Sequence, residues 1–220
     1  KRGSTVGIIG GTGSGKSTLI NLIPRFYDVT QGSVEVDGRN VKDYSFKQLR
    51  KQIGIVPQQS ILFKGTIRDN MKWENPDLSD EDIITALKNA QAYEFVSKLP
   101  MGLDSHVEQG GKNFSGGQRQ RLCIARAIAA QPKVLILDDS FSALDFATDA
   151  ALRKALSQYT HEMTVIIVTQ RCSTIMNSDL ILVLDDGMLV GKGTHKELLK
   201  NCETYKEICL SQLSKSEVEV

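Results

Sequence analysis

Four short runs of mostly apolar, often β-branched residues recur along the chain, at 5–10, 53–58, 133–139 and 164–170. Strands buried on both faces of a parallel sheet show this kind of near-continuous apolar run. Helical patterns lie between the later runs, at 118–131 and 147–159. The alternation predicts parallel strands joined by crossover helices, and therefore an α/β fold.

Two further segments have the pattern of antiparallel hairpins. Residues 32–41 turn at Asp37-Gly38, and residues 180–193 turn at Asp186-Gly187. Asp-Gly favours the two positive φ angles that tight hairpin turns need. We therefore expect an antiparallel part beside the parallel strands.

The stretch from about 60 to 131 is largely helical and polar and has no strong strand pattern. We interpret it as a helical subdomain inserted into a sheet core formed by 1–59 and 132–220. The start, Lys1-Arg2-Gly3, runs at once into a strand, so we expect a domain excised from a longer protein, with its N-terminal strands truncated. The polar tail 214–220 is predicted to be disordered.

Composition narrows the range of partners. Lys and Arg number 27 against 26 Asp and Glu, so no bulk charge draws the chain toward nucleic acid or an acidic membrane. The apolar runs all fall short of the ~20 residues that span a bilayer. Four cysteines, Cys123, Cys172, Cys202 and Cys209, have no CxxC or His spacing typical of a metal site, and this favours reduced thiols.

The strongest chemical motif is the sequence GGTGSGKST at 10–18, between an apolar strand and a helical run. It matches the phosphate-binding pattern GxxxxGK[ST] in its required strand–loop–helix context. Its glycines let backbone N–H groups turn toward phosphate oxygens at a helix N-terminus. Lys16 is expected to reach the β- and γ-phosphates and Ser17 to bind Mg²⁺. The predicted nucleotide-binding residues here are Gly10, Gly11, Thr12, Gly13, Ser14, Gly15, Lys16, Ser17 and Thr18.

A second part of the site is predicted at the end of the run 134–139. Asp138 would hold Mg²⁺ through water, as the carboxylate after an apolar strand does in P-loop NTPases. Alone, an Asp after a strand is more often a cap of the strand end. Together with the loop at 10–18 it indicates a site for Mg²⁺ and ATP.

The segment 113–121, NFSGGQRQR, resembles the signature motif of ABC ATPases, whose commonest form is LSGGQ. Ser115 and the glycines after it begin a helix, so they offer a hydroxyl and N–H donors to an anion. The resemblance implies that the signature residues, Phe114, Ser115, Gly116, Gly117 and Gln118, bind the γ-phosphate of ATP held by an opposite subunit. It also implies the fold: a P-loop NTPase (RecA-like), mainly parallel sheet with an antiparallel part and an inserted helical subdomain.

The resemblance covers essentially the whole chain. Gln58 matches the Q-loop, which contacts Mg²⁺ and water, although alone it would read as a polar residue after a strand. The segment 142–145 matches the D-loop, with Ser142 and Asp145 near the seam between subunits. Segments 24–41 and 62–70 resemble the exporter branch (multidrug or lipid type).

Two positions depart from the family pattern. Asp139 stands where a Glu usually acts as general base, and Gln170 stands where a His usually serves as the switch residue. Because Asp is one methylene shorter than Glu, the Asp139 carboxylate would lie roughly an ångström further from the attacking water. A misplacement of that size can cost ~10²-fold in rate. Losing a general base costs ~10²–10⁴-fold. We list Asp139, Gln170 and Lys16 as the catalytic set of a weak ATPase.

The paired substitution resembles the degenerate-site subunit of a heterodimeric exporter. Its own site would hydrolyse ATP slowly, while its signature completes the site of an unlike partner domain. Two alternatives stay open: an active homodimer that tolerates Asp139, and a nucleotide-gated regulatory module with negligible turnover. A DNA-repair or translation ATPase is disfavoured by the exporter-type segments and the balanced charge.

The resemblance further implies ATP and Mg²⁺ as ligands and the transmembrane domains of a transporter as partners, with no nucleic acid. It places the domain at the cytoplasmic face of the cell membrane. In this family the aromatic that stacks on adenine lies upstream of the phosphate loop. None of the nine residues before Gly10 is aromatic, so we expect weak adenine binding.

Overall fold

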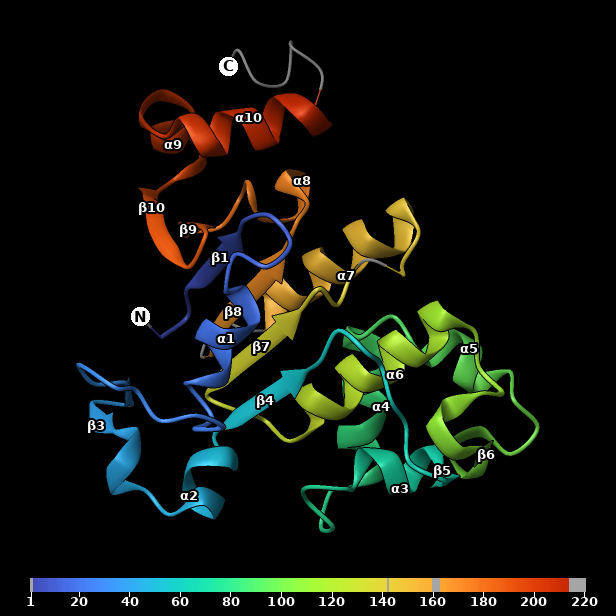
Figure 1. Cartoon of the computed structure of the whole chain (residues 1–220). Coiled ribbons are helices and arrows are strands. Elements are labelled where there is room, and N and C mark those ends of the chain that lie inside the picture. Colours follow the sequence, from blue (N-terminus) through green and yellow to red (C-terminus); the bar gives the residue numbers. More distant parts are fainter. Residues whose placement is uncertain (1, 142, 160–162, 214–220) are drawn as a thin grey trace.

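The computed structural model describes residues 2–141, 143–159 and 163–213, without the side chains of residues 146 and 157–159. Its centre is a six-stranded sheet (Figure 1). In order, the strands are β10 (Met188–Gly193), β9 (Leu180–Asp185), β1 (Thr5–Ile9), β8 (Thr164–Thr169), β7 (Val134–Asp138) and β4 (Ile53–Val56). All pairs are parallel except β9–β10. The α/β fold with a mainly parallel sheet is thus confirmed.

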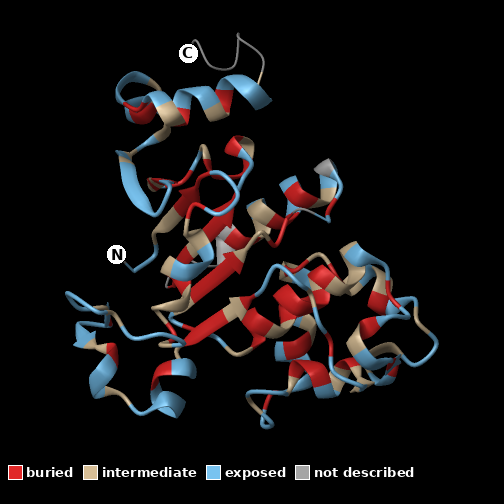
Figure 2. Ribbon diagram, viewed as in Figure 1, coloured by how far each residue is buried: buried red, intermediate tan, exposed pale blue. Residues whose placement is uncertain are grey.

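Both faces of the sheet are covered, which explains the near-continuous apolar runs. In β7, Ile136 belongs to one buried cluster, whereas Leu135 and Leu137 belong to another. The first cluster includes residues of α1 (Lys16–Asn21) and α2 (Phe46–Arg50); the second includes residues of α6 (Gly116–Ala129), α7 (Phe146–Tyr159) and α8 (Cys172–Ile175). Figure 2 shows the buried strands between these helices.

The two expected hairpins form at the expected turns. The small hairpin joins β2 (Glu35–Val36) to β3 (Arg39–Asn40), and the larger one joins β9 to β10. Asp37 and Gly38 have φ of 55° and 72°, and Asp186 and Gly187 have 45° and 75°. Positive φ at both central residues is the type I′ geometry that matches strand twist.

Between β4 and β7 the chain is mainly helical, as its pattern predicts. It contains α3 (Ile67–Met71), α4 (Asp80–Asn89), α5 (Tyr93–Ser97) and α6. Two-residue strands β5 (Gly65–Thr66) and β6 (His106–Val107) also pair there, and the sequence did not predict them. Short 3-10 turns lie in the same region at Gly102–Asp104 and Gln109–Gly111, and another lies before β4 at Val41–Asp43.

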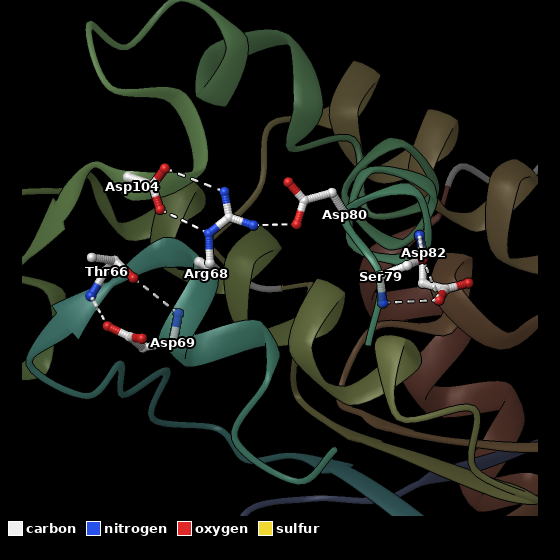
Figure 3. A network of polar contacts seen from close by, with 7 residues as sticks. All are labelled: Thr66, Arg68, Asp69, Ser79, Asp80, Asp82 and Asp104. Carbon is white, nitrogen blue, oxygen red and sulfur yellow. Dashed lines mark hydrogen bonds and ion pairs between the residues drawn. The ribbon is translucent and has the colours of Figure 1, made fainter. Parts of the chain in front are cut away.

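A single arginine joins three parts of this helical region (Figure 3). Arg68 in α3 donates to both carboxylate oxygens of Asp104, at 2.8 and 3.2 Å, and also pairs with Asp80 at the start of α4. The hydrogen bonds from Arg68 lower the pKa of Asp104. Capping boxes begin both helices, Thr66 with Asp69 and Ser79 with Asp82. These contacts fix where α3 and α4 start.

The C-terminal part packs against the sheet edge formed by β9 and β10. It consists of α9 (His195–Asn201) and α10 (Glu203–Gln212), and α10 also contacts α8. The expected tail at 214–220 lies outside the described residues. Within the described ranges, no helix has the length and apolar character required to cross a bilayer.

Candidate functional site

The predicted site residues follow the carboxyl ends of adjacent parallel strands. Register pairs Ile9 with Thr169, Val168 with Asp138, and Leu137 with Val56, so β1, β8, β7 and β4 end side by side. Open parallel sheets bind ligands at this edge, next to the point where strand order reverses. The structure therefore gathers the phosphate loop, both aspartates, Gln58 and Gln170 along one edge. The four strands can be followed in Figure 1.

The phosphate loop curls because two of its glycines adopt a left-handed conformation that other residues adopt only rarely. Gly13 and Gly15 have φ of 81° and 89°, and α1 begins directly after Gly15. At Gly10 an added Cβ would lie only 2.1 Å from the carbonyl oxygen of Leu184, which leaves no room for a side chain. Successive turns of this kind make a concave nest of N–H groups that suits phosphate.

The Lys16 side chain folds back over this loop. Its amino group donates to the carbonyl oxygens of Gly10 and Gly11, at 2.9 and 2.6 Å, and lies 3.3 Å from the Ser14 hydroxyl. Burial lowers the pKa of Lys16, while Asp138 and Asp139 act in the opposite direction. A nucleotide phosphate in the nest would therefore find this ammonium close by.

Ser17 connects the phosphate loop to the end of β7. Its hydroxyl donates a 3.2 Å hydrogen bond to a carboxylate oxygen of Asp138. Partial burial raises the pKa of Asp138, partly offset by the Ser17 bond, and nearby Asp139 raises it further. Hydroxyl and carboxylate oxygens are the ligands Mg²⁺ prefers, and a cation here would relieve the repulsion between the two carboxylates. The donor set thus fits Mg²⁺.

Asp139 and Ser140 continue from the strand end. Asp139 has φ of 48°, and its N–H donates to the Val168 carbonyl at 2.9 Å, so its backbone is anchored to β8. The buried Ser140 hydroxyl donates to the Val56 carbonyl at 3.0 Å and so connects β7 to the start of the Gln58 loop. The sequence motif did not single out Ser140.

Gln58 and Gln170 both have exposed side chains at this edge. The backbone at Gln170 is fixed from an unexpected direction. Gln212, in the last turn of α10, donates to the Gln170 carbonyl at 2.7 Å and accepts from the Cys172 N–H at 2.9 Å. Because 42 residues separate Gln212 from Gln170, no local pattern could have indicated this contact.

The signature segment forms the capped start of α6, as its residues predict. Ser115 accepts from the Gln118 N–H at 3.2 Å, and the Gln118 side chain accepts from the Ser115 N–H at 3.0 Å. The Ser115 hydroxyl keeps its own hydrogen for donation to an anion. The Phe114 side chain is buried beside Phe95, with ring centroids 6.3 Å apart, so we assign it to packing.

The D-loop segment packs against the signature. A Cβ on Gly117 would lie 3.3 Å from the Ala143 carbonyl oxygen, so only a glycine fits there easily. The Asp145 carboxylate accepts from the Thr148 N–H and hydroxyl, at 2.9 and 2.7 Å, and caps the start of α7. These bonds lower the pKa of Asp145. Ser142 lies outside the described residues.

Comparisons with known proteins agree with this geometry. Residues 1–142 match the family described as ABC transporter. A bacterial Atm1-family ABC exporter, solved with ATP bound, superposes with a TM-score of 0.92. That structure is 37% identical in sequence, and the match covers 98% of this chain and 38% of the exporter chain.

Curated relatives extend the likeness over nearly the whole chain. An uncharacterized ABC transporter ATP-binding protein of Mycobacterium tuberculosis is 49% identical over 96% of this chain. A Staphylococcus aureus protein named "Putative multidrug export ATP-binding/permease protein" is 44% identical over 94%. This chain spans 36% of the length of each, or about a third.

Proposed function

Because this chain belongs to the ABC transporter family, we propose that it is the ATP-binding domain of an exporter that dimerises head to tail around MgATP. The observation that carries the proposal is the Ser17–Asp138 contact beside the Lys16 ammonium, in a loop shaped for phosphate. The similarity to exporter sequences and to an exporter structure supports the transport role.

Nucleotide binding is proposed to proceed by exchange of partners at Lys16. In the structure its amino group donates hydrogen bonds to two carbonyl oxygens of its own loop. On nucleotide binding, hydrogen bonds to β- and γ-phosphate oxygens would replace them. Ser17 and Asp138 would hold Mg²⁺, the latter through water, with Gln58 approaching from the neighbouring strand end. The bound Mg²⁺ would neutralise charge that develops on the phosphate oxygens.

The signature is proposed to act on the ATP of a partner domain. Ser115 and the N–H groups at the start of α6 form a donor set for an anion, and Gly116 and Gly117 leave the backbone there uncovered by side chains. The adjoining D-loop packs on the same surface, so both would meet the partner together.

Hydrolysis at this chain's own site is proposed to be slow, with an unlike, competent partner completing the exporter. Asp139 has a shorter side chain than the Glu usual at the general-base position. Gln170 can hydrogen-bond to a γ-phosphate but carries no imidazolium charge. Neither departure from the family pattern alters a residue that is predicted to bind the phosphates. Such a site would hold ATP and stabilise the closed pair between slower turnovers.

The surface just beyond Gln58 is proposed to contact the transmembrane domains. Phe63 and Trp73 stack with ring centroids 4.0 Å apart, yet the Trp73 side chain is 59% exposed and Ile61 is 50% exposed. Exposed apolar groups gathered in this way often mark a protein interface. Closure of the dimer would move this surface and so transmit force to the membrane part.

Steady-state ATP hydrolysis at high protein concentration tests the proposal. The chain is compared with its Asp139→Glu, Gln170→His double variant. A triple variant that also carries Lys16→Ala is the control, because it shows whether any gain in hydrolysis comes from this phosphate loop. A homodimer joins an intact signature to each altered site, so the comparison isolates the two substitutions. A rise of about 10²-fold or more, abolished by Lys16→Ala, supports a slow native site.

Other outcomes would overturn parts of the proposal. Equal and substantial rates would mean that Asp139 is a working base and that the chain forms an active homodimer. If neither form turns over but ATP still drives dimerisation in sedimentation experiments, the nucleotide-gated regulatory function is favoured. Failure of both forms to bind MgATP would reject the ATP-binding function itself.

A further inference from the structure

A cluster of potential metal ligands lies next to residues 170–172, which we call the switch segment, and apart from the phosphate site. It comprises Cys172 at the start of α8, His195 at the start of α9, and Cys209 in α10, and we call it the Cys172 cluster. Their ligand atoms, two sulfurs and one imidazole nitrogen, all lie within 4.8 Å of one another. Residues far apart in sequence are brought together because α10 packs across α8 and α9.

The cluster is held in place by the core. Both cysteines are fully buried and His195 is half-buried. The Tyr205 hydroxyl, also from α10, lies 2.8 Å from His195 Nδ1 and 3.5 Å from Cys172 Sγ. Partners of this kind around metal-binding side chains orient them and tune their donor strength. The packing of α8, α9 and α10 therefore keeps these donors close to one another.

We propose that Cys172, His195 and Cys209 form a binding site for Zn²⁺. Thiolate and imidazole are the usual zinc ligands, with Zn–S near 2.3 Å and Zn–N near 2.0–2.1 Å. A tetrahedral site with these bonds sets its ligand atoms roughly 3.4–3.8 Å apart, so a contraction of about an ångström closes the cluster. The Tyr205 hydroxyl offers a further oxygen donor beside His195 and Cys172.

Charge balance favours a divalent ion such as Zn²⁺ over a monovalent one. On binding, each of the two thiols gives up its proton to the solvent and forms a bond to the metal. Two thiolates, a neutral imidazole and Zn²⁺ sum to zero, which limits the cost of burying the complex. Cu⁺ would leave a net negative charge in the same pocket. Mg²⁺ prefers oxygen ligands and belongs at Ser17 and Asp138 instead.

The site would tie the C-terminal helix to the switch segment. Cys172 follows Gln170 by two residues, and α10 already contacts both positions through Gln212. Zinc held by Cys172 and Cys209 would add a further attachment between α8 and α10. We therefore expect bound zinc to stabilise the fold, since it binds the native arrangement and not the dispersed ligands.

Cobalt substitution tests the proposal on the metal-free chain. Co²⁺ should give near-ultraviolet thiolate charge-transfer absorption at one equivalent, and Zn²⁺ should bleach it. Zinc titration in weakly buffered solution should release about two protons per ion. Competition with a chromogenic chelator should show at least tenfold weaker zinc binding in Cys172→Ser and in Cys209→Ser.

Cys202→Ser is the matched control. Cys202 is also buried in the C-terminal part, but its sulfur lies against the Val190 carbonyl at 3.8 Å, outside the cluster. This variant should keep the cobalt spectrum and the zinc affinity. His195→Ala should weaken binding without removing either thiol, which covers the case in which a cysteine variant fails to fold. The proposal is overturned if Co²⁺ gives no thiolate band, since ligation by oxygen at Asp138 gives none. It is also overturned if the band keeps its full intensity at one equivalent in Cys172→Ser.

Discussion

The side-chain amide of Gln212, at the end of the C-terminal helix, donates a 2.7 Å hydrogen bond to the backbone carbonyl of Gln170. Its amide oxygen accepts from the N–H two residues further on. The backbone of the switch segment is thus held by a helix that the nucleotide-binding motifs do not include. Any movement of the Gln170 backbone toward a γ-phosphate must stretch these bonds or carry α10 with it.

Replacing Gln212 with Leu should release this segment. The variant loses two hydrogen bonds at a solvent-facing position, so we expect a loss of about 1 kcal/mol in unfolding free energy. Amide hydrogen exchange at Cys172 should become faster. Ser211→Ala is the control, since within the described residues that hydroxyl bonds to the Ile208 carbonyl of its own helix. Unchanged exchange at Cys172 in Gln212→Leu would contradict the proposed restraint.

Mixing two inactive variants should test whether the signature acts across the dimer. Lys16→Ala removes phosphate binding in its own loop, and Ser115→Arg blocks the donor set offered to the partner. Neither variant alone should dimerise with ATP. A mixed pair keeps one intact composite site, the loop of Ser115→Arg facing the signature of Lys16→Ala. Sedimentation should therefore show ATP-dependent dimers only in the mixture; their absence would argue against action in trans.

Asp138→Asn should raise the melting temperature at pH 7 without Mg²⁺ or nucleotide. Burial raises the pKa of Asp138, so its charge costs stability at neutral pH, and this cost disappears as acid protonates the wild type. The gain should vanish near pH 3. Asparagine can still accept the Ser17 hydrogen bond.

Asp145→Asn should change the melting temperature at pH 7 in the opposite direction to Asp138→Asn. The bonds from Thr148 lower the pKa of Asp145, so the charged form stabilises the fold at neutral pH. This contribution is present above the unfolded pKa and is lost as pH falls through the folded value. We expect the variant to melt lower at pH 7. Equal shifts of the same sign in both variants would contradict the assignment.

Arg68→Met should lower the melting temperature by about 2–4 °C at pH 7, through loss of its paired contacts with Asp104 and Asp80. The difference should shrink as pH falls through the lowered pKa of Asp104, because a protonated carboxyl loses its attraction to Arg68. Lys98→Met removes an exposed pair between Glu94 and the residue that follows α5, and should change little. Similar shifts in melting temperature in both variants would show that the network in Figure 3 stabilises the fold no more than an isolated surface pair does.

Much of the fold could be predicted from the sequence because its signals are local. β-branched runs mark the buried strands, and Asp-Gly marks both hairpins. Ser115 predicts the start of α6 by its capping pattern. The paired strands at Gly65–Thr66 and His106–Val107 could not be predicted, because two residues are too few to show a period of two. The order of strands in the sheet likewise depends on packing across the whole chain.

The candidate site likewise has features that the sequence predicts and features that it does not. The spacing of the phosphate loop predicts its curled backbone, but the direction of the Lys16 side chain depends on nearby carbonyls. The sequence associates Phe114 with the signature, whereas its large apolar ring fills the core beside Phe95. Cys172, His195 and Cys209 meet only through the folding of α8, α9 and α10, so spacing rules for metal sites could not reveal them.

The central position of β1 has a consequence for synthesis on the ribosome. Thr5 pairs with Val165 on one side, and Val6 pairs with Leu180 on the other. At about 5–20 residues per second, roughly ten to thirty seconds pass before either neighbour of β1 has been translated. During that time the first strand, with the phosphate loop attached, emerges without its partners. The nascent chain must keep this apolar segment from pairing wrongly until the last third of the domain arrives.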